Sequence, residues 1–266
     1  MKRTWLCLLL GLIECTVTSS ADFATEALDA TYKLFHPAST ATCLFIRGGA
    51  PDKALYLVTA AHVLEHTQGD TAIVVLRERL SDGSYRRRDH TIAVRREGKP
   101  LWVRHAAEEA AVLRLSEPTC VPVAALPVSA LADEARLKAA ELHICSPVFV
   151  LTYPARFEAN DAGFAVARQG IIASHPFLPI ERQHTYLVNF TTFEGDSGAP
   201  VFVRDAKGRP LIIGIVIANI RYDEQVKTSY EERMMHHPLG LGTVLHAQFV
   251  RDVIEQAAKQ SGPDSK

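Results

Sequence analysis

The chain of 266 residues has little net charge, few cysteines and no long apolar run. Its formal net charge at pH 7 is −1, which argues against nucleic acid or an anionic membrane as a partner because both select basic proteins. No Cys-x-x-Cys pair or clustered Cys/His pattern occurs. We therefore expect no metal site and no cofactor.

The N-terminus has the parts of a secretory signal. Lys2 and Arg3 form a charged start, Trp5 to Ile13 is apolar but too short for an ordinary membrane span, and Ser19 to Ala21 have small side chains. We expect residues 1–21 to be a signal peptide, so that the protein is exported to a periplasm or secreted, with no stable membrane insertion afterwards. An uncleaved anchor is the alternative.

Removal of the signal peptide leaves three cysteines, Cys43, Cys120 and Cys145. Because three is an odd number, at most one internal disulfide can form. Export permits such a bond. The sequence does not select a pair, and three free thiols are an equal alternative.

Short β-rich segments dominate the mature chain. The sequence predicts strands at 41–46, 54–58, 72–76, 90–94, 111–115, 143–152, 164–168, 170–174, 186–190, 201–203 and 211–217. A short helix is expected within 130–142, and apolar residues at helical spacing predict an amphipathic helix over 247–258. Many short strands without βαβ alternation indicate an all-β protein with two barrels.

Prolines mark the connection between the two halves. Pro118, Pro122 and Pro127 disfavour regular structure. The predicted organisation is an N-terminal barrel at 22–118, a connection at 119–140, a C-terminal barrel at 141–246 and a C-terminal helix at 247–260.

Two separated motifs supply a nucleophile and a base. Ser197 lies in Gly-Asp-Ser-Gly-Ala-Pro at 195–200, and His62 follows a β-rich segment and the small residues Thr-Ala-Ala. A serine attacks only when a base removes its proton. The backbone N–H groups of Gly195 and Ser197 are candidate donors to an oxyanion, because glycine permits the backbone angles required. Taken alone, the hexapeptide is also compatible with a simple turn.

The other histidines lack this context. His66 lies one turn beyond His62 and is expected to be exposed, and His236 and His237 precede Pro238 and are expected in a loop.

Together the two motifs resemble the trypsin/chymotrypsin-like serine proteases, in the chain order histidine, acid, serine. The resemblance covers residues 28–258 and implies two antiparallel six-stranded β-barrels. Bacterial members, including the protease part of the HtrA type, are the most similar in their short loops and C-terminal helix, and we expect no PDZ domain. The family places its acid just before a segment like 111–115, which puts Glu109 at that position with Glu108 beside it.

The chain departs from the family pattern in three respects. Glu109 is one methylene longer than the usual aspartate, and Val63 stands where a cysteine usually follows the histidine. No Ile-Val-Gly-Gly start exists whose freed amine would pair with Asp196. Asp196 therefore requires another partner or a solvated setting.

The resemblance also locates a specificity pocket. Its positions carry Thr191, Thr192, Ile217 and Asn219, with Glu194 near the rim. No acid lies at the pocket base, so we expect uncharged residues of small or medium size before the cleaved bond rather than lysine or arginine.

We therefore predict an exported serine endopeptidase that acts on protein or peptide substrates through a triad of His62, Glu109 and Ser197. The alternative is a catalytically impaired homologue that binds peptides. An α/β-hydrolase is disfavoured, because Ala199 stands where that class requires its last glycine and no parallel sheet is predicted.

Overall fold

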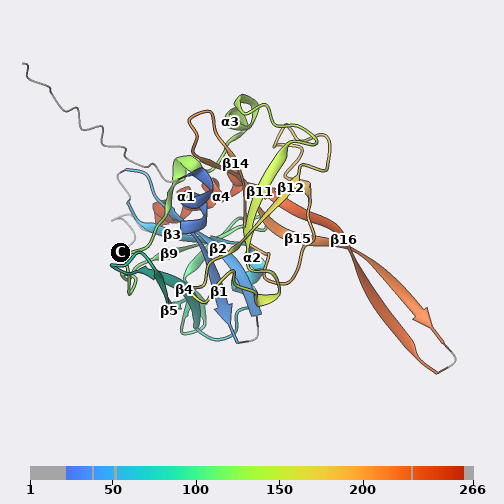
Figure 1. Cartoon of the computed structure of the whole chain (residues 1–266), viewed down its shortest axis with the longest axis horizontal. Helices are drawn as coiled ribbons and strands as arrows, with labels where there is room; N and C mark the ends of the chain where they lie inside the picture. The colour runs from blue at the N-terminus through green and yellow to red at the C-terminus, as the bar shows by residue number, and fades with distance from the viewer. Residues whose placement is uncertain (1–21, 38, 51–52, 229, 261–266) are drawn as a thin grey trace, which may run out of the picture.

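Two β-sheets, one from each half of the chain, make up most of the structure, and the C-terminal helix packs against strands of both (Figure 1). The structure is a computed structural model that describes residues 22–37, 39–50, 53–228 and 230–260. The predicted signal peptide, residues 1–21, lies outside the described residues. Strands dominate and helices are few, which confirms the all-β class.

The first sheet has the strand order β5-β4-β1-β2-β3-β9-β8, with β10 paired in parallel to β2. Its strands are β1 (Thr31–His36), β2 (Ser39–Arg47), β3 (Leu55–Thr59), β4 (Thr71–Arg79), β5 (Tyr85–Ala93), β8 (Trp102–Arg104), β9 (Ala111–Leu115) and β10 (Leu126–Pro127). The short strands β8 and β10 bring the count to eight, above the six that were expected. A separate ribbon pairs β6 (Arg95–Arg96) with β7 (Lys99–Pro100).

The second sheet has six strands in the order β12-β11-β14-β15-β16-β13, all antiparallel. Its strands are β11 (Pro147–Thr152), β12 (Val166–Ile171), β13 (Thr185–Asn189), β14 (Pro200–Arg204), β15 (Pro210–Lys227) and β16 (Glu232–His246). A bridge joins Ile172, the residue after the edge strand β12, to Val188 of the other edge strand, β13. The six-stranded count expected for this half is therefore present.

A central apolar core joins the two sheets. It contains Leu44 and Tyr56 of the first sheet and Phe202 and Ile215 of the second, all at most 1% exposed. Each such buried side chain stabilises the fold by roughly 1.5–3 kcal/mol relative to exposure. This shared core fixes how the two halves face each other, and the candidate site lies where they meet.

Helices cover the shared core and the ends of strands. Helix α4 (Ala247–Gln260) turns Val250, Val253 and Ile254 into the central core, as its amphipathic pattern predicted. Helix α1 (Phe23–Asp29) packs on the same core and was not predicted. The remaining helical turns are α2 (Ala61–His66), α3 (Glu134–Ala139), η1 (Val128–Ala130) and η2 (Pro154–Arg156).

Several predicted boundaries differ from the structure. The strand expected at 143–152 begins at Pro147, because residues 143–146 form a turn. The two strands expected at 164–168 and 170–174 are one, β12, since Gly170 continues its pairing with β11. The prediction of a loop at His236 and His237 was wrong, because both lie in β16, paired to β15.

Three cysteines of the described residues are free: Cys43 is buried in the first sheet, and Cys120 and Cys145 are exposed. Across residues 22–37, 39–50, 53–228 and 230–260, no helix combines the length and apolar character needed to cross a bilayer.

Candidate active site

His62 lies at the start of α2, directly after the buried strand β3. Ala60 and Ala61 are fully buried, so only small side chains fit at the turn that carries the chain from strand to helix. The His62 side chain emerges from this turn 31% exposed, at the border between the sheets. Close packing around this turn therefore explains why small residues precede His62 in the sequence.

The His62 ring bridges a serine and a carboxylate. Its Nε2 atom lies 2.9 Å from Ser197 Oγ, and its Nδ1 atom lies 3.0 Å from Glu109 Oε2. A carboxylate can only accept a hydrogen bond, so Nδ1 carries the proton in this contact. In the neutral ring Nε2 is then the acceptor, and the Ser197 hydroxyl donates to it.

Glu109 lies in the loop before β9, and two groups of His62 hold its carboxylate. Glu109 Oε2 accepts from the His62 ring and from the His62 backbone N–H, the latter at 3.2 Å. Burial on its own raises the pKa of the Glu109 carboxyl, but these hydrogen bonds, with the charges of His62 and Arg104, hold that pKa below its usual value. The carboxylate therefore stays ionised beside the ring.

The other candidate acids are engaged elsewhere. Glu108 Oε1 lies 2.8 Å from Nδ1 of His184 in the second half, and Asp89 pairs with Arg87 at 2.7 Å. Glu109 is thus the acid that faces His62, in the place that the sequence predicted.

Two glycines shape the turn that carries Ser197. Gly195 and Gly198 have φ angles of 99° and 84°, which favour glycine. A Cβ atom at Gly195 would lie 2.2 Å from the Tyr153 carbonyl oxygen, and one at Gly198 would lie 2.2 Å from the Thr42 carbonyl oxygen. Neither position can hold a side chain without moving backbone.

Both sheets hold the serine turn in place. From the first sheet, Thr42 donates its backbone N–H to the Ser197 carbonyl (3.0 Å) and its hydroxyl to the Gly195 carbonyl (2.8 Å). From the second sheet, the Val216 carbonyl accepts from the Gly198 N–H at 2.7 Å. Ser197 is therefore positioned against His62 by contacts across the domain border.

The backbone N–H groups of Gly195 and Ser197 make no hydrogen bond within the described residues. The Glu194 carbonyl accepts from the Ala155 N–H at 2.6 Å. In a trans peptide the N–H points opposite to the preceding carbonyl, so the Gly195 N–H points away from Ala155. Two unused donors beside a nucleophile are the arrangement that an oxyanion requires.

Arg168 is the partner of Asp196, and the sequence analysis missed it. Asp196 is 1% exposed, and its Oδ2 atom lies 3.0 Å from Arg168 Nη1 and accepts from the Phe193 N–H at 2.9 Å. The Thr152 hydroxyl donates to the other oxygen. Burial raises the pKa of the Asp196 carboxyl, against the effect of these three donors.

Arg168 projects from β12 and stacks over the rings of Phe190 and Phe193, at 5.0 and 5.6 Å from their centroids. The Arg168 guanidinium balances the negative charge of the Asp196 carboxylate, so this carboxylate has a cationic partner without a freed N-terminal amine. The sequence offered one indication of this role, an arginine inside the predicted strand 164–168. An arginine at an exposed strand position gives the same pattern.

Residues 41–215 match the model of the trypsin-like peptidase domain. The chain belongs to this family. The family assignment confirms the resemblance drawn from the two motifs and identifies the chain as a trypsin-like protease fold, of a hydrolase class that acts on protein substrates.

Solved structures similar to this peptidase include two of the inactive form of the Rv3671c protease. One, from M. tuberculosis H37Rv, is a serine-to-alanine mutant; it is 18% identical over 90% of this chain and 92% of that chain, with a TM-score of 0.47. The other is 19% identical over 90% and 93% of the two chains, with a TM-score of 0.46. No curated protein matches the chain.

The residues predicted for the specificity pocket lie on two segments of the peptidase. Thr192 is buried, Ile217 is half-buried, and Thr191 and Asn219 are exposed. Gly242 of β16 is the close neighbour of Thr192, since a Cβ there would lie 2.9 Å from Thr192 Cγ2. Their role in specificity stays a prediction.

Two acids that follow these positions in β15 point elsewhere. Asp223 lies 2.6 Å from His236 Nδ1, and Glu224 lies 2.9 Å from His237 Nε2, in both cases across the β15–β16 pair. Neither carboxylate supplies the acidic pocket base that lysine or arginine would require.

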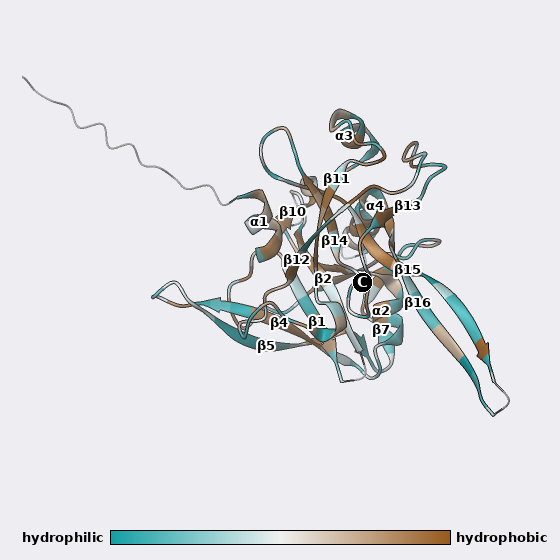
Figure 2. Ribbon diagram, turned by 45° about the vertical axis from the view of Figure 1, so that its right-hand side comes forward, coloured by the Kyte–Doolittle hydropathy of each residue, from teal (hydrophilic) through white to brown (hydrophobic). Residues whose placement is uncertain are grey.

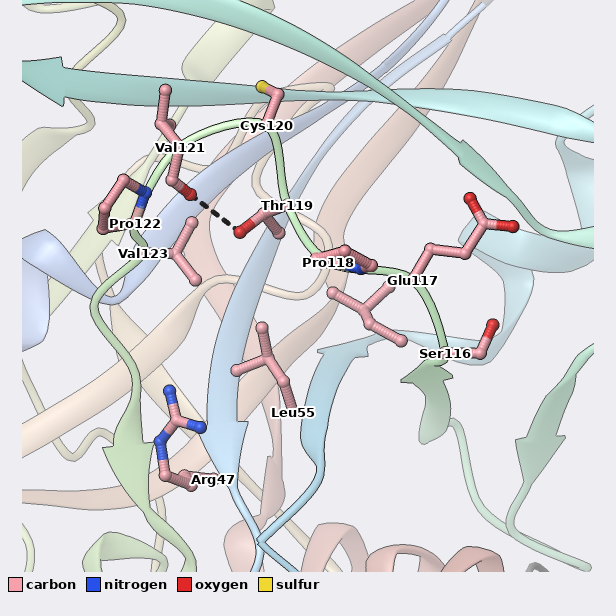
Figure 3. Close-up of a pocket in the computed structure, with 11 residues that line it drawn as sticks. Arg47, Leu55, Ser116, Glu117, Pro118, Thr119, Cys120, Val121, Pro122 and Val123 are labelled. Carbon is pink, nitrogen blue, oxygen red and sulfur yellow. Dashed lines mark hydrogen bonds between the residues drawn. The ribbon is translucent and has the colours of Figure 1, made fainter.

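A shallow pocket of about 630 Å³ lies away from this site (Figure 3). Arg47, Leu55 and the segment 115–123 line it, and none of the predicted site residues does. In the described part of the chain, no group of three or more His, Cys, Asp and Glu side chains is arranged to hold a metal ion.

Proposed function

We propose that the chain is an exported serine endopeptidase that cleaves protein or peptide substrates through an acyl-enzyme. The observation that carries the proposal is the His62 ring, which lies 2.9 Å from Ser197 Oγ on one side and 3.0 Å from Glu109 Oε2 on the other. The charged, apolar and small-residue segments of residues 1–21 support export.

In the first half of the reaction, His62 Nε2 takes the Ser197 hydroxyl proton while Oγ bonds to the substrate carbonyl carbon. The carbonyl oxygen becomes an oxyanion, and the N–H groups of Gly195 and Ser197 stabilise it. Collapse of this intermediate breaks the C–N bond, and His62 donates its proton to the leaving amine. Water then enters and the same groups hydrolyse the ester.

Glu109 has an orienting role in this scheme. Its carboxylate accepts the Nδ1 proton, which keeps Nε2 free to act as a base, and it stabilises the imidazolium that forms. The longer glutamate side chain does not prevent this, because Glu109 Oε2 contacts both the ring and the backbone N–H of His62. The alternative of an inactive binding module rested on this glutamate alone, so the geometry favours the enzyme.

Substitution of the nucleophile tests the proposal. Ser197→Ala should lower kcat for peptide hydrolysis by about 10⁶-fold, because no other group forms the acyl-enzyme. Ser116→Ala removes an exposed hydroxyl outside the site and is the matched control. Hydrolysis of an unstructured protein such as casein, and its loss in a Ser197→Ala protein with an unchanged circular dichroism spectrum, would support the assignment. Hydrolysis retained by that variant would refute it.

A further inference from the structure

The loop that connects β11 to β12 contains two strained residues next to the serine turn. Ala155 and Arg156 have φ angles of 48° and 69°, in the left-handed region that residues with a side chain rarely adopt. Both side chains are exposed, so side-chain packing does not hold the backbone there. Strain of this kind persists only where the surroundings impose it, and it concentrates at functional sites.

This loop contacts the peptide that carries the first candidate oxyanion donor. The Ala155 N–H donates to the Glu194 carbonyl at 2.6 Å, and a Cβ atom at Gly195 would lie 2.2 Å from the Tyr153 carbonyl oxygen. The Glu194 carbonyl and the Gly195 N–H belong to one planar peptide, so a bond to the carbonyl fixes the direction of the N–H. The conformation of the loop therefore determines where the Gly195 N–H points.

A buried lysine of the first sheet holds the next part of the loop. Lys33 lies in β1, is 6% exposed, and donates from Nζ to the Arg156 carbonyl at 2.8 Å. The Glu158 carboxylate lies 2.6 Å from the same nitrogen and balances its charge. An ammonium group has three donors. A single side chain of the first sheet thus holds both a carbonyl and a carboxylate of this loop in the second half.

The first sheet also brings Lys33 beside a residue that holds the serine turn. Lys33 and Thr42 are direct partners in the antiparallel β1–β2 pair, so their side chains lie on one face. Thr42 contacts the Ser197 and Gly195 carbonyls. β1 contacts β11, and β2 contacts η2; Figure 2 shows β1 and β2 together, below β11 and β12. One face of the first sheet therefore holds both segments that flank the oxyanion site.

We infer that Lys33 is a positioning residue for the oxyanion site. Its contact with the Arg156 carbonyl keeps residues 155–156 in the left-handed conformation. The Ala155 N–H then stays on the Glu194 carbonyl, and the Gly195 N–H stays aimed at the substrate oxygen. Without Lys33, residues 155–156 return to ordinary backbone angles, and the peptide between residues 194 and 195 is free to turn its N–H away.

This inference rests on the proposed peptidase function, and a charge-balanced variant tests it. Lys33→Met combined with Glu158→Gln removes the contact with the Arg156 carbonyl and leaves no unpaired buried charge. For a peptide p-nitroanilide ending in Ala-Pro-Val, kcat should fall by about 10–100-fold, as an oxyanion donor is displaced. KM should change by less than about twofold, because this donor acts mainly in the transition state.

Two single variants accompany it. Lys33→Met alone, in which Arg87 still pairs with Glu158 at 2.7 Å, should show the same loss of kcat. Arg87→Met is the matched control, because it removes a cation from Glu158 and leaves the contact between Lys33 and the Arg156 carbonyl in place. Its kcat should stay within about threefold of the wild type.

A peptide trifluoromethyl ketone with the same residues probes the oxyanion site directly. Ser197 Oγ bonds to its carbonyl carbon, the hydroxyl proton passes to His62 Nε2, and the carbonyl oxygen becomes an oxyanion that the backbone N–H groups stabilise. Its inhibition constant should rise by the factor by which kcat/KM falls, because such an analogue loses what the transition state loses. A role of Lys33 in stability alone would leave this constant unchanged in a folded variant.

Glycine in the strained loop supplies a rescue. Glycine adopts left-handed backbone angles without strain, and the exposed side chains of Ala155 and Arg156 lose no packing when they are removed. Ala155→Gly and Arg156→Gly, added to the charge-balanced variant, should therefore raise its kcat by about threefold or more. A purely structural role for Lys33 predicts no such recovery.

The outcomes distinguish this inference from the proposed function. If the wild-type protein cleaves no peptide, the peptidase proposal fails and this inference fails with it. If the wild type cleaves and a folded Lys33 variant keeps kcat within about threefold, the inference alone is overturned. It is also overturned if kcat falls while the inhibition constant of the ketone stays unchanged, or if Arg87→Met lowers kcat as much as Lys33→Met does.

Discussion

The two sides of the proposed catalytic centre are held in different ways. On the base side, the His62 and Glu109 side chains are 31% and 39% exposed and are tied mainly to each other. On the Ser197 side, Asp196 is 1% exposed, and the turn around it contacts both sheets. One side is a local polar pair at the surface, and the other is part of the core.

Because of this difference, we expect substitutions on the two sides to affect the catalytic rate and the free energy of unfolding differently. A change at the exposed pair removes a hydrogen bond that water can replace, so we expect a loss of rate with little loss of stability. A change beneath the serine turn leaves a buried charge unpaired, which destabilises the fold as well as the oxyanion site. Four substitutions test this contrast.

Glu109→Gln should have the largest effect on rate. The amide can donate as well as accept, so it no longer fixes the proton on Nδ1 or stabilises the imidazolium, and kcat should fall by about 10⁴-fold. The free energy of unfolding, measured in urea, should change by less than about 1 kcal/mol because the site is exposed. A folded Glu109→Gln enzyme with near-normal kcat would show that another group orients His62.

Arg168→Met should lower both rate and stability. It leaves the Asp196 carboxylate buried without its cation, which costs about 3–5 kcal/mol in a buried pair, and a displaced turn should lower kcat by about 10²–10³-fold, as loss of an oxyanion donor does. Arg168→Lys, which keeps the charge, should recover part of both. Urea unfolding and peptide hydrolysis measure the two effects.

The loss in Arg168→Met should depend on pH. Burial already raises the pKa of Asp196, and removal of Arg168 raises it further. A raised carboxyl pKa means that the folded state holds the proton more tightly than the unfolded state, so stability falls as pH rises. The deficit of the variant should therefore be smallest at acid pH and grow toward neutral pH. An equal deficit at pH 4 and pH 7 would contradict an ionic role for Arg168.

His246→Phe should alter the acid stability and leave the rate unchanged. Burial lowers the pKa of His246 to about 4 from its usual 6.5. The unfolded state then binds the proton more tightly, so stability is lost as pH falls from 6.5 toward 4, by about 3 kcal/mol in all. Phenylalanine, packed against Phe177 and Tyr186 as the imidazole is, should flatten this slope in urea titrations. His143→Gln, at an exposed position, should not.

Glu108→Gln should have the smallest effect. Glu108 links the loop of Glu109 to His184 of the second half, in a contact at 2.8 Å that is partly open to solvent. Such pairs contribute about 0–1 kcal/mol, so kcat/KM should change by at most about fivefold. A loss as large as that of Glu109→Gln would show that Glu108 is the orienting acid.

The sequence located Ser197 and His62 because the turns that carry these two residues leave local motifs. Ser197 needs glycines at 195 and 198, which have positive φ angles and touch backbone, and His62 needs small neighbours in a buried turn. Glu109 was found through the resemblance to the family, which places an acid just before the segment that forms β9. The all-β class and the amphipathic helix α4 followed from periodicity.

The Arg168–Asp196 ion pair and the outward extension of β15 and β16 were not predicted, because neither produces a pattern in the local sequence. Arg168 meets Asp196 only because β12 and the serine turn lie together in the folded second sheet. The outer parts of β15 and β16 combine charged and apolar residues without clear alternation, and they are strands because they pair with each other out to Lys227 and Glu232. Pairing of this kind depends on contacts that single-sequence patterns do not record.

The most direct test of the account is covalent labelling with a fluorophosphonate. A serine activated by His62 attacks the phosphorus and releases fluoride, which leaves a stable adduct that peptide mapping by mass spectrometry can place. We predict a single adduct on Ser197, absent in Ser197→Ala and strongly slowed in His62→Ala. A folded wild-type protein that is not labelled, or one labelled on a different serine, would contradict the assignment of this site as the catalytic centre.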